Sequence, residues 1–272
     1  MMYLLIIAFP SANIFSQNIP SGSDGKKLMA VFAHADDELL VAPVLAKYAA
    51  EGVKVHLIVV TDGRWGTTDH AGIPGGDSLA TIRKQELFCS AAALGLQPPV
   101  ILGIQDQLHF KDGWNAFTGA LDSMRRAVYK LFLELKPDVL ITFGPSGWTG
   151  HPDHRLVGIT VTEIFAYQKW DWPVRLYYPE LPTGSISDDS RTRYFTVDSS
   201  HLTIRVPVTE RDFKKAKSAW QCHKSQYTTA AQERLSKFIW DTQKGIAMFR
   251  QFLPNPSKKS SLFDTIPDSF SP

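Results

Sequence analysis

Two short polar segments of this sequence contain residue types that can bind a metal ion. In residues 32–38, Phe-Ala-His-Ala-Asp-Asp-Glu, one histidine is followed closely by two adjacent aspartates. In residues 150–154, Gly-His-Pro-Asp-His, two histidines lie three positions apart. A histidine and a carboxylate from one turn can supply two of the three protein ligands of a catalytic zinc, so the third ligand must come from elsewhere in the chain.

The elements around these segments predict that both lie at strand ends. Residues 28–31 form an apolar run before the first segment, and residues 39–42 begin a run compatible with a helix. The second segment follows a run typical of a buried strand at 137–144, and its Pro152 is expected at the first position of a helix. The spacing of His151 and His154 then places both imidazoles on one face of the first helical turn.

In this order and spacing, the two segments resemble the His-Pro-Asp-Asp-Glu and His-Pro-Asp-His signatures of the PIG-L/LmbE-like zinc deacetylases. The resemblance extends from about residue 27 to about residue 226 and includes four further segments: 61–63, 83–86, 94–95 and 222–226. One departure is Ala35, which stands where the family usually has proline. This replacement loosens the turn but removes no ligand.

The resemblance implies that His34, Asp37 and His154 bind zinc. Three nitrogen and oxygen ligands leave a fourth position for water, and zinc lowers the pKa of that water to about 7. The same ligand types also suit Fe(II) or Co(II). Asp36 lies beside a ligand without being needed as one, and we expect it to be the general base.

The remaining site residues are also assigned by resemblance and position. His151, if protonated, would stabilise the tetrahedral oxyanion, and Asp153 would orient a histidine from the first turn of its helix. Arg83 is expected to contact the sugar, and Asp106 matches an acidic position beside the substrate. Glu38 and His223 are expected to be structural or to support the ligands.

The resulting functional hypothesis is a zinc-dependent hydrolase that removes the N-acetyl group from an N-acetylglucosamine-type sugar or conjugate. Its partner would be a small amino-sugar molecule. Two alternatives stay open: an amidase that cleaves a larger acyl group from an amino-sugar or thiol conjugate, and a non-catalytic sugar-binding module. A nucleotide-dependent enzyme lacks support because no Gly-x-Gly-x-x-Gly motif follows the first strand.

Alternating strand and helix patterns up to about residue 160 predict an α/β fold. We expect a Rossmann-like, mostly parallel sheet with helices on both faces and a C-terminal α+β extension. The expected strands and helices lie at 53–60, 100–103, 137–144, 175–178, 194–197 and 202–206, and at 38–51, 77–94, 116–135, 152–159, 209–224 and 229–252. Residues 63–78 are expected to be a substrate lid, because long loops at strand ends are usually functional.

Composition is ordinary for a globular protein, with 44% apolar and 21% charged residues among 272. A net charge of +2 gives no reason to expect nucleic-acid binding, and no interior stretch is apolar enough for a stable membrane anchor. The oligomeric state is left open. Cys89 and Cys222 could pair in an exported protein, but we expect free, buried thiols because both lie in helix-like apolar surroundings.

The ends of the chain differ from its middle. Residues 1–17 resemble a short signal peptide, so we expect export to the periplasm or the medium, with a cytoplasmic location otherwise. Residues 18–26 read as a linker, residues 27–253 as a single deacetylase-like domain, and residues 254–272 as a loosely ordered tail.

Overall fold

A seven-stranded sheet runs through the part of the chain that the computed structural model describes, residues 25–186 and 194–253. The expected signal peptide, most of the linker and the expected tail lie outside these residues. The strands are β1 (Lys27–Phe32), β2 (Lys54–Thr61), β3 (Val100–Ile104), β4 (Val139–Ile141), β5 (Arg175–Pro179), β6 (Ile204–Pro207) and β7 (Ile246–Gln251).

The strand order β3-β2-β1-β4-β5-β7-β6 places β1 in the middle of the sheet. The first five strands are parallel, and β7 and β6 extend the edge beyond β5 as antiparallel strands. The order in which strands are added to the sheet reverses between β1 and β4. Strands β2 and β3 lie on one side of β1, and β4 and β5 lie on the other. Open α/β sheets bind ligands at such a switch point, beyond the carboxyl ends of the strands.

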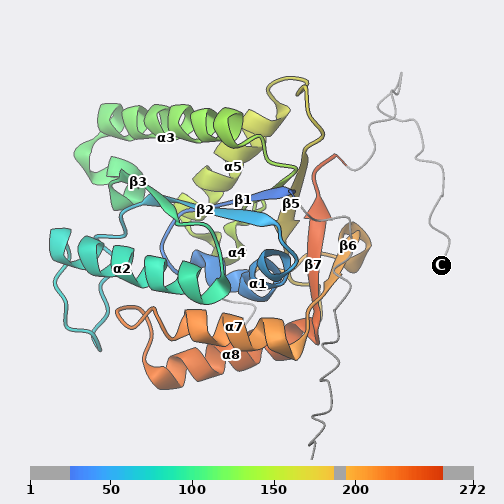
Figure 1. Cartoon of the computed structure of the whole chain (residues 1–272). Helices are drawn as coiled ribbons and strands as arrows, with labels where there is room; N and C mark the ends of the chain where they lie inside the picture. The colour runs from blue at the N-terminus through green and yellow to red at the C-terminus, as the bar shows by residue number, and fades with distance from the viewer. Residues whose placement is uncertain (1–24, 187–193, 254–272) are drawn as a thin grey trace, which may run out of the picture.

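Helices cover both faces of this sheet (Figure 1). The α-helices are α1 (Ala42–Ala50), α2 (Asp77–Leu94), α3 (Trp114–Leu135), α4 (Gly147–Gly150), α5 (Pro152–Ala166), α7 (Glu210–Trp220) and α8 (Thr229–Gln243), and the 3-10 helices are η1 (Asp37–Leu40), η2 (Asp106–Asp112) and η3 (Ser199–His201). Helices α3 and α5 pack on one face, α1 and α2 lie on the other, and α7 packs against both α1 and α2.

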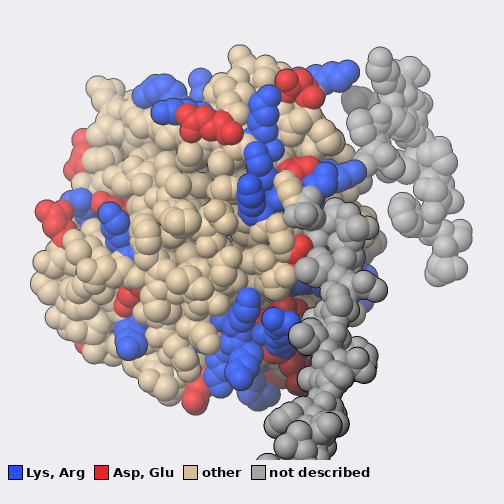
Figure 2. All heavy atoms as spheres, in the orientation of Figure 1, with Lys and Arg blue, Asp and Glu red and all other residues tan. Residues whose placement is uncertain are grey.

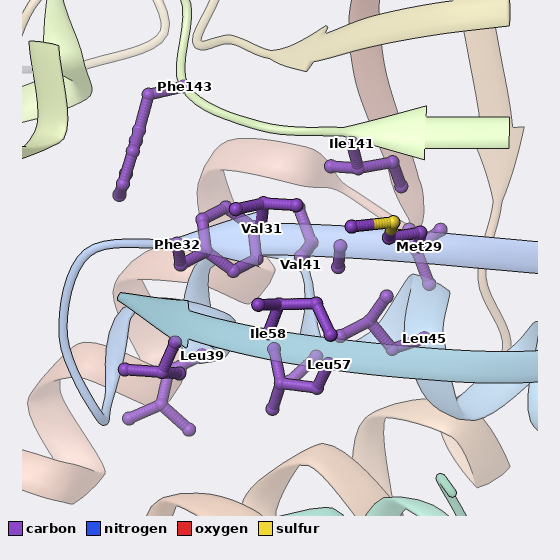
Figure 3. Close-up of a cluster of buried hydrophobic side chains, with 14 of the residues drawn as sticks. Met29, Val31, Phe32, Leu39, Val41, Leu45, Leu57, Ile58, Ile141 and Phe143 are labelled. Atoms are coloured by element: carbon purple, nitrogen blue, oxygen red, sulfur yellow. The ribbon is translucent and has the colours of Figure 1, made fainter. Parts of the chain in front are cut away.

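The core is centred on β1 because both faces of that strand are covered. Leu28 through Phe32 are all buried, which explains why the strand reads as an unbroken apolar run rather than an alternating one. Figure 3 shows Met29, Val31 and Phe32 of this strand among labelled side chains of β2, η1 and α1. Phe143 closes the core beyond the end of β4, with its ring 5.1 Å from that of Phe32.

The sequence predicted the α/β architecture, and its differences from the structure lie mainly in the C-terminal part. The helix expected at 38–51 is split by Val41 into η1 and α1, and residues 194–197 form only an isolated bridge, at Val197. The helix expected at 229–252 ends at Gln243 and is followed by β7. Lys244 (φ 45°) and Gly245 (φ 77°) stop that helix, a signal that the apolar periodicity obscured.

A disulfide joins Cys89 to Cys222, with the two Cα atoms 5.8 Å apart. The expectation of free, buried thiols was therefore wrong on both counts, because Cys89 is exposed and Cys222 half-buried. The two residues are 133 positions apart, so no local pattern indicated that α2 and the segment after α7 meet.

Charges of both signs are interspersed on the face shown in Figure 2, as the small net charge predicts. Within the described ranges, none of the helices combines the length and the apolar character needed to span a membrane.

Candidate metal centre

Two turns meet at the switch point between β1 and β4, and each carries one of the two histidine segments. Residues 33–36 connect β1 to η1, while α4 and His151 connect the end of β4 to α5. Because β1 and β4 are adjacent and parallel, their carboxyl ends lie at the same edge of the sheet. The structure therefore brings together residues that are about 120 positions apart in the sequence.

His34, Asp37 and His154 converge as the resemblance implied. The Nδ1 atom of His34 lies 3.2 Å from Nε2 of His154 and 3.5 Å from Oδ2 of Asp37. The Oδ1 atom of Asp37 lies 3.1 Å from Nε2 of His154. All three residues are at most 8% exposed.

The hydrogen bonds around these residues suit a bound cation. Nδ1 of His154 lies 2.9 Å from the Gly147 carbonyl and donates to it, so its Nε2 lone pair faces the centre. Nε2 of His34 lies 3.2 Å from carboxylate oxygens of both Asp106 and Asp153 and carries the proton, so its Nδ1 lone pair also faces the centre. Two lone pairs and a carboxylate that converge in a buried site are a donor set suited to a metal ion.

The charges at this centre shift the pKa values of His34 and Asp37. Burial opposes the charged form of His34, but Asp106, Asp153 and Asp37 outweigh it and hold its pKa well above the usual value. Burial would raise the pKa of Asp37, but His154 and His34 hold it well below its usual value. The centre therefore favours positive charge on the histidines or between them, and the residues present fit a metal ion.

Asp36 occupies a strained turn beside these residues. Its φ of 109° and ψ of −16° are uncommon for a residue with a side chain. Its Oδ1 atom accepts from Nη2 of Arg83 (3.0 Å) and its Oδ2 atom accepts from the Tyr227 hydroxyl (2.9 Å). Burial raises the pKa of Asp36, although Arg83 opposes the rise.

Arg83 lies beneath this turn. It is 3% exposed, and its guanidinium donates to the carbonyls of Ala35 (2.5 Å) and Gly63 (3.2 Å) as well as to Asp36. Asp37 Oδ2 in turn accepts from the backbone amides of Ala33 and His34. These side-chain contacts brace the turn at the position where Ala35 replaces the family's proline.

His151 lies at the N-cap of α5 and is exposed. Its Nδ1 atom accepts from the Asp153 amide (3.2 Å), so Nε2 carries the proton of the neutral ring. Although part of the side chain is exposed, neighbouring atoms shield the rest of the ring from solvent, and this partial burial, followed by the charges of His34 and His154, lowers the pKa of His151. From the sequence, His151 was assigned an oxyanion-stabilising role if protonated; the lowered pKa favours the neutral ring, which still donates from Nε2.

Asp106 of η2 and Asp153 of α5 both contact the imidazole of His34. Besides its contact with His34, Asp106 accepts from the Trp65 amide (3.1 Å), and Asp153 accepts from the Gln107 amide (3.1 Å). Asp153 thus orients a histidine, as its position in the sequence suggested. Asp106 was expected beside the substrate. Its carboxylate, like that of Asp153, contacts Nε2 of His34 and so helps to orient that ring.

A cavity of about 300 Å³ opens over the centre. Its polar lining contains seven of the eight predicted site residues, all except Asp153, together with Gln107 and Gln226. Its apolar lining, here called the apolar wall, comes partly from α8: Leu39, Leu40, Tyr194, Leu235 and Ile239. Trp65 and Gly66, from the expected lid, also line the cavity.

Sequence reasoning missed Tyr227 and the apolar wall. Tyr227 directly follows the 222–226 segment that carries part of the resemblance, so its hydroxyl was a signal that could have been used. Leu235 and Ile239 lie four positions apart on one face of α8, a spacing that reads only as core packing until the tertiary structure places that face over the site.

A second cavity, of about 310 Å³, lies at the amino ends of β1, β4 and β5. Its lining is mainly apolar, with Lys26, Lys27 and Arg175 among the charged residues. No histidine is among the residues that line this second cavity, so the candidate metal centre is the one at the switch point.

The fold and the site together define a Rossmann-like α/β protein with a two-histidine, one-carboxylate centre suited to a metal ion. Residues 29–165 match the family model described as PIG-L, GlcNAc-PI de-N-acetylase. The chain belongs to the PIG-L family.

Among named relatives, the chain is similar to 1D-myo-inositol 2-acetamido-2-deoxy-alpha-D-glucopyranoside deacetylase 2 of Catenulispora acidiphila. The two are 36% identical over 152 residues, which is 49% of each chain. A deacetylase of the same description from Mycobacteroides abscessus is 33% identical over 178 residues, covering 59% of this chain and 62% of that protein. The chain spans about half the length of the curated relatives that it matches.

Among solved structures, the chain resembles N,N'-diacetylchitobiose deacetylase from Pyrococcus horikoshii, with a TM-score of 0.63, 21% identity and 84% of each chain covered. It also resembles GalB, the 4-carboxy-2-hydroxymuconate hydratase from Pseudomonas putida KT2440, with a TM-score of 0.59 and 15% identity, covering 87% of this chain and all of that one. Since a deacetylase and a hydratase share this fold, these two likenesses establish the architecture and leave the reaction to the site.

Proposed function

We propose that this protein is a zinc-dependent hydrolase that removes the N-acetyl group from an N-acetylglucosamine-type sugar or conjugate. The observation that carries the proposal is the convergence of His34, Asp37 and His154 within 3.1–3.5 Å. The carboxylate of Asp36, which is not one of these three groups, lies next to them, in the same turn as His34 and Asp37. Membership of the PIG-L family and the names of its deacetylase relatives supply the substrate class.

His34 Nδ1, His154 Nε2 and the Asp37 carboxylate would hold the zinc ion. When bound, zinc supplies Lewis acidity and makes a coordinated water acidic near neutral pH. Asp36 would accept the proton of the attacking water, because its carboxylate lies at the cavity and its raised pKa makes it a stronger base than a free aspartate.

His151 also lines the cavity, where it can act on the carbonyl group of the substrate amide. Its Nε2–H donates to the carbonyl oxygen, where negative charge develops, and a neutral imidazole at a helix N-terminus can do this without carrying charge. The proton held by Asp36 is then available for the departing amine. Arg83 and Tyr227 keep the Asp36 carboxylate in place throughout.

The residues that line the cavity suit different groups of an amino-sugar substrate. Polar groups such as Asp106, Gln107 and Gln226 suit the hydroxyl groups of a sugar, and the lid residue Trp65 offers a ring face to its C–H groups. Arg83 is too enclosed by backbone carbonyls to be the main sugar contact, so we assign it to Asp36 instead.

The direct test is to measure metal content and acetate release on the same preparation. Substrates are N-acetylglucosaminyl inositol, N,N'-diacetylchitobiose and free N-acetylglucosamine. We expect one zinc per chain and acetate release that stops on chelation and returns with zinc. Zinc-loaded protein that releases no acetate from any acylamino sugar would reject the proposal, and reactivation by Fe(II) or Co(II) alone would reject the metal.

A second candidate is an amidase for a larger acyl group. The apolar wall formed by Leu235 and Ile239 of α8 favours it, because a longer acyl chain would bury more apolar surface there than an acetyl group. A series of N-acylglucosamines of increasing chain length separates the two. Higher kcat/KM for the longer chains would select the amidase.

We also propose export of the protein. The Cys89–Cys222 disulfide supports this, because disulfides persist in oxidising compartments and are rare in the cytosol of most organisms. Fractionation of the native host followed by detection of the chain tests it.

A further inference from the structure

Three polar side chains that the proposed reaction does not use lie directly beneath the Asp36 turn. Glu38, Ser90 and His223 are each fully buried. Oε1 of Glu38 accepts from the Ser90 hydroxyl and from Nε2 of His223, both at 2.6 Å. Its Oε2 atom accepts from the backbone amide of Asp36 at 2.9 Å.

This cluster joins three separate segments. Glu38 belongs to η1, Ser90 to α2, and His223 to the turn after α7. Cys89 and Cys222, the neighbours of Ser90 and His223, form the disulfide. A covalent link therefore holds together the two segments that supply the donors to Glu38.

The contact to Asp36 falls on a residue whose conformation needs support. Asp36 has the only positive φ in the turn between β1 and η1, and a side chain makes that conformation unfavourable. Arg83 and Tyr227 hold the two oxygens of its carboxylate, while Glu38 holds its backbone amide. The metal ligand Asp37 is fastened separately, by the amides of Ala33 and His34.

His223 has a feature that points to the same role. Its Nδ1 atom is buried without a hydrogen-bond partner among the described residues, so the contact of Nε2 with Glu38 is the one hydrogen bond of the ring in that part of the chain. Leaving a buried nitrogen unpaired is unfavourable, and a purely structural position would be filled better by an apolar side chain.

We propose that Glu38, fixed by Ser90 and His223, is a positioning residue that holds Asp36 in the conformation needed for proton transfer. The catalytic step that Glu38 would support, proton transfer by Asp36, rests on the proposed function. The backbone conformation of Asp36 that Glu38 holds rests only on the contacts described above. This role separates the base from the metal: loss of Glu38 misplaces the Asp36 carboxylate and leaves the three ligands in place.

The first test compares Glu38→Ala with Glu38→Gln in the full chain. For Glu38→Ala we expect kcat to fall about 10- to 100-fold, as for other groups that support catalytic residues, with KM and zinc content little changed. Glu38→Gln keeps an oxygen for the Asp36 amide, and the tautomer of His223 with its proton on Nδ1 offers the Nε2 lone pair to the new NH2 group. We therefore expect Glu38→Gln to recover most of kcat.

Asp212→Ala is the matched control for lost stability. Asp212 is buried and forms the capping box of α7 with Thr209, but it does not contact Glu38. We expect it to lower Tm with little change in kcat. If Glu38→Ala lowers kcat no more than Asp212→Ala does, or if Glu38→Gln is as impaired as Glu38→Ala, the positioning role is wrong.

A second readout needs neither zinc nor substrate. In metal-free protein, hydrogen exchange of the Asp36 amide should accelerate in Glu38→Ala and stay as in the parent chain in Asp212→Ala. An unchanged Asp36 amide overturns the inference even if the parent chain is an active deacetylase. Accelerated exchange supports it even if the parent chain releases no acetate. If Glu38→Ala does not fold, Ser90→Ala takes its place in both measurements, with a smaller change in the same direction.

Discussion

Asp36 and Asp37 are adjacent residues of one type, and their surroundings give them different roles. Asp37 contacts two imidazoles and two backbone amides, which hold its pKa well below the usual value. Asp36 is buried, and its pKa is raised despite the nearby Arg83. One carboxylate is therefore a permanent anion suited to a cation, and its neighbour is suited to gain and release a proton.

The Asp36→Asn substitution tests this division. Asparagine keeps the size and an oxygen for Arg83 but does not act as a base, so we expect kcat to fall by about 10²- to 10⁴-fold. Zinc content, measured by elemental analysis, should stay at one per chain. Asp112→Asn, at an exposed position of η2, is the control and should keep full activity. Retained turnover in Asp36→Asn would remove Asp36 from the role of base.

Asp138 gives a prediction for stability against pH at a site distant from the metal centre. Burial would raise its pKa, but the Lys26 ammonium (2.9 Å) and the Lys27 amide (2.9 Å) outweigh this and lower it. A lowered folded pKa adds stability above the unfolded value of 3.8, and this stability is lost as pH falls through the folded pKa.

We therefore expect Asp138→Asn to lower the free energy of unfolding by about 0.5–1 kcal/mol at pH 7, a small value because the ion pair is partly exposed. The difference from the parent chain should shrink as pH falls below 4. Urea unfolding across this pH range measures it. A difference that grows toward acid would contradict the assigned direction of the pKa shift.

At the scale of elements, the position of His154 depends on how closely α5 approaches the end of β4. A Cβ atom on Gly158 would lie 2.4 Å from the Phe143 carbonyl oxygen, so only glycine permits this approach. The Phe143 ring stacks on the His154 imidazole, with centroids 4.2 Å apart and planes 2° from parallel. Any shift of α5 away from the strand would move a metal ligand.

We expect Gly158→Ala to lower the free energy of unfolding by roughly 1–3 kcal/mol through this overpacking, and to weaken zinc binding. Gly119→Ala in α3 is the matched control. An added methyl there has nothing within 4 Å, and it should be neutral or stabilise by about 0.5–1 kcal/mol. Chemical unfolding and zinc titration measure the two effects. Equal stability of the two variants would show that α5 can move without cost.

At the scale of the whole molecule, the N-terminal and C-terminal parts of the sequence build one site. Helices α7 and α8 and strands β6 and β7 follow the parallel strands, and α8 completes a wall of the cavity that opens on β1 and β4. The disulfide ties α2 to the segment that leads from α7 into α8. The extension therefore belongs to the site as well as to the sheet.

Replacing both cysteines by serine should lower the free energy of unfolding by about 2–5 kcal/mol, because the bond restricts a long segment of the unfolded chain. Thermal unfolding with and without reductant measures this. The reduced parent chain is the control and should unfold with the double variant. Equal Tm values for the oxidised parent and the double variant would show that the bond adds nothing to stability.

The sequence by itself determined the ligand types, their order and the strand-turn-helix units that carry them. His34 and Asp37 could be found because they follow the end of β1 within five residues, and His154 because it lies in the first turn of α5, where local patterns are strong. The mostly parallel sheet followed from the same alternation.

Only the tertiary structure decided what depends on contacts between distant segments. Two of these contacts join residues more than 100 positions apart: the hydrogen bond from Tyr227 to Asp36 and the disulfide between Cys89 and Cys222. A third, from the Asp36 amide to Glu38, is local, but it depends on a backbone conformation that the residue types do not predict. Local propensity reports on neighbours along the chain. Which side chains converge on a carboxylate depends on how the helices pack on the sheet. That packing raises the pKa of Asp36 and lowers the pKa of Asp37, and this difference underlies the roles that we propose for them.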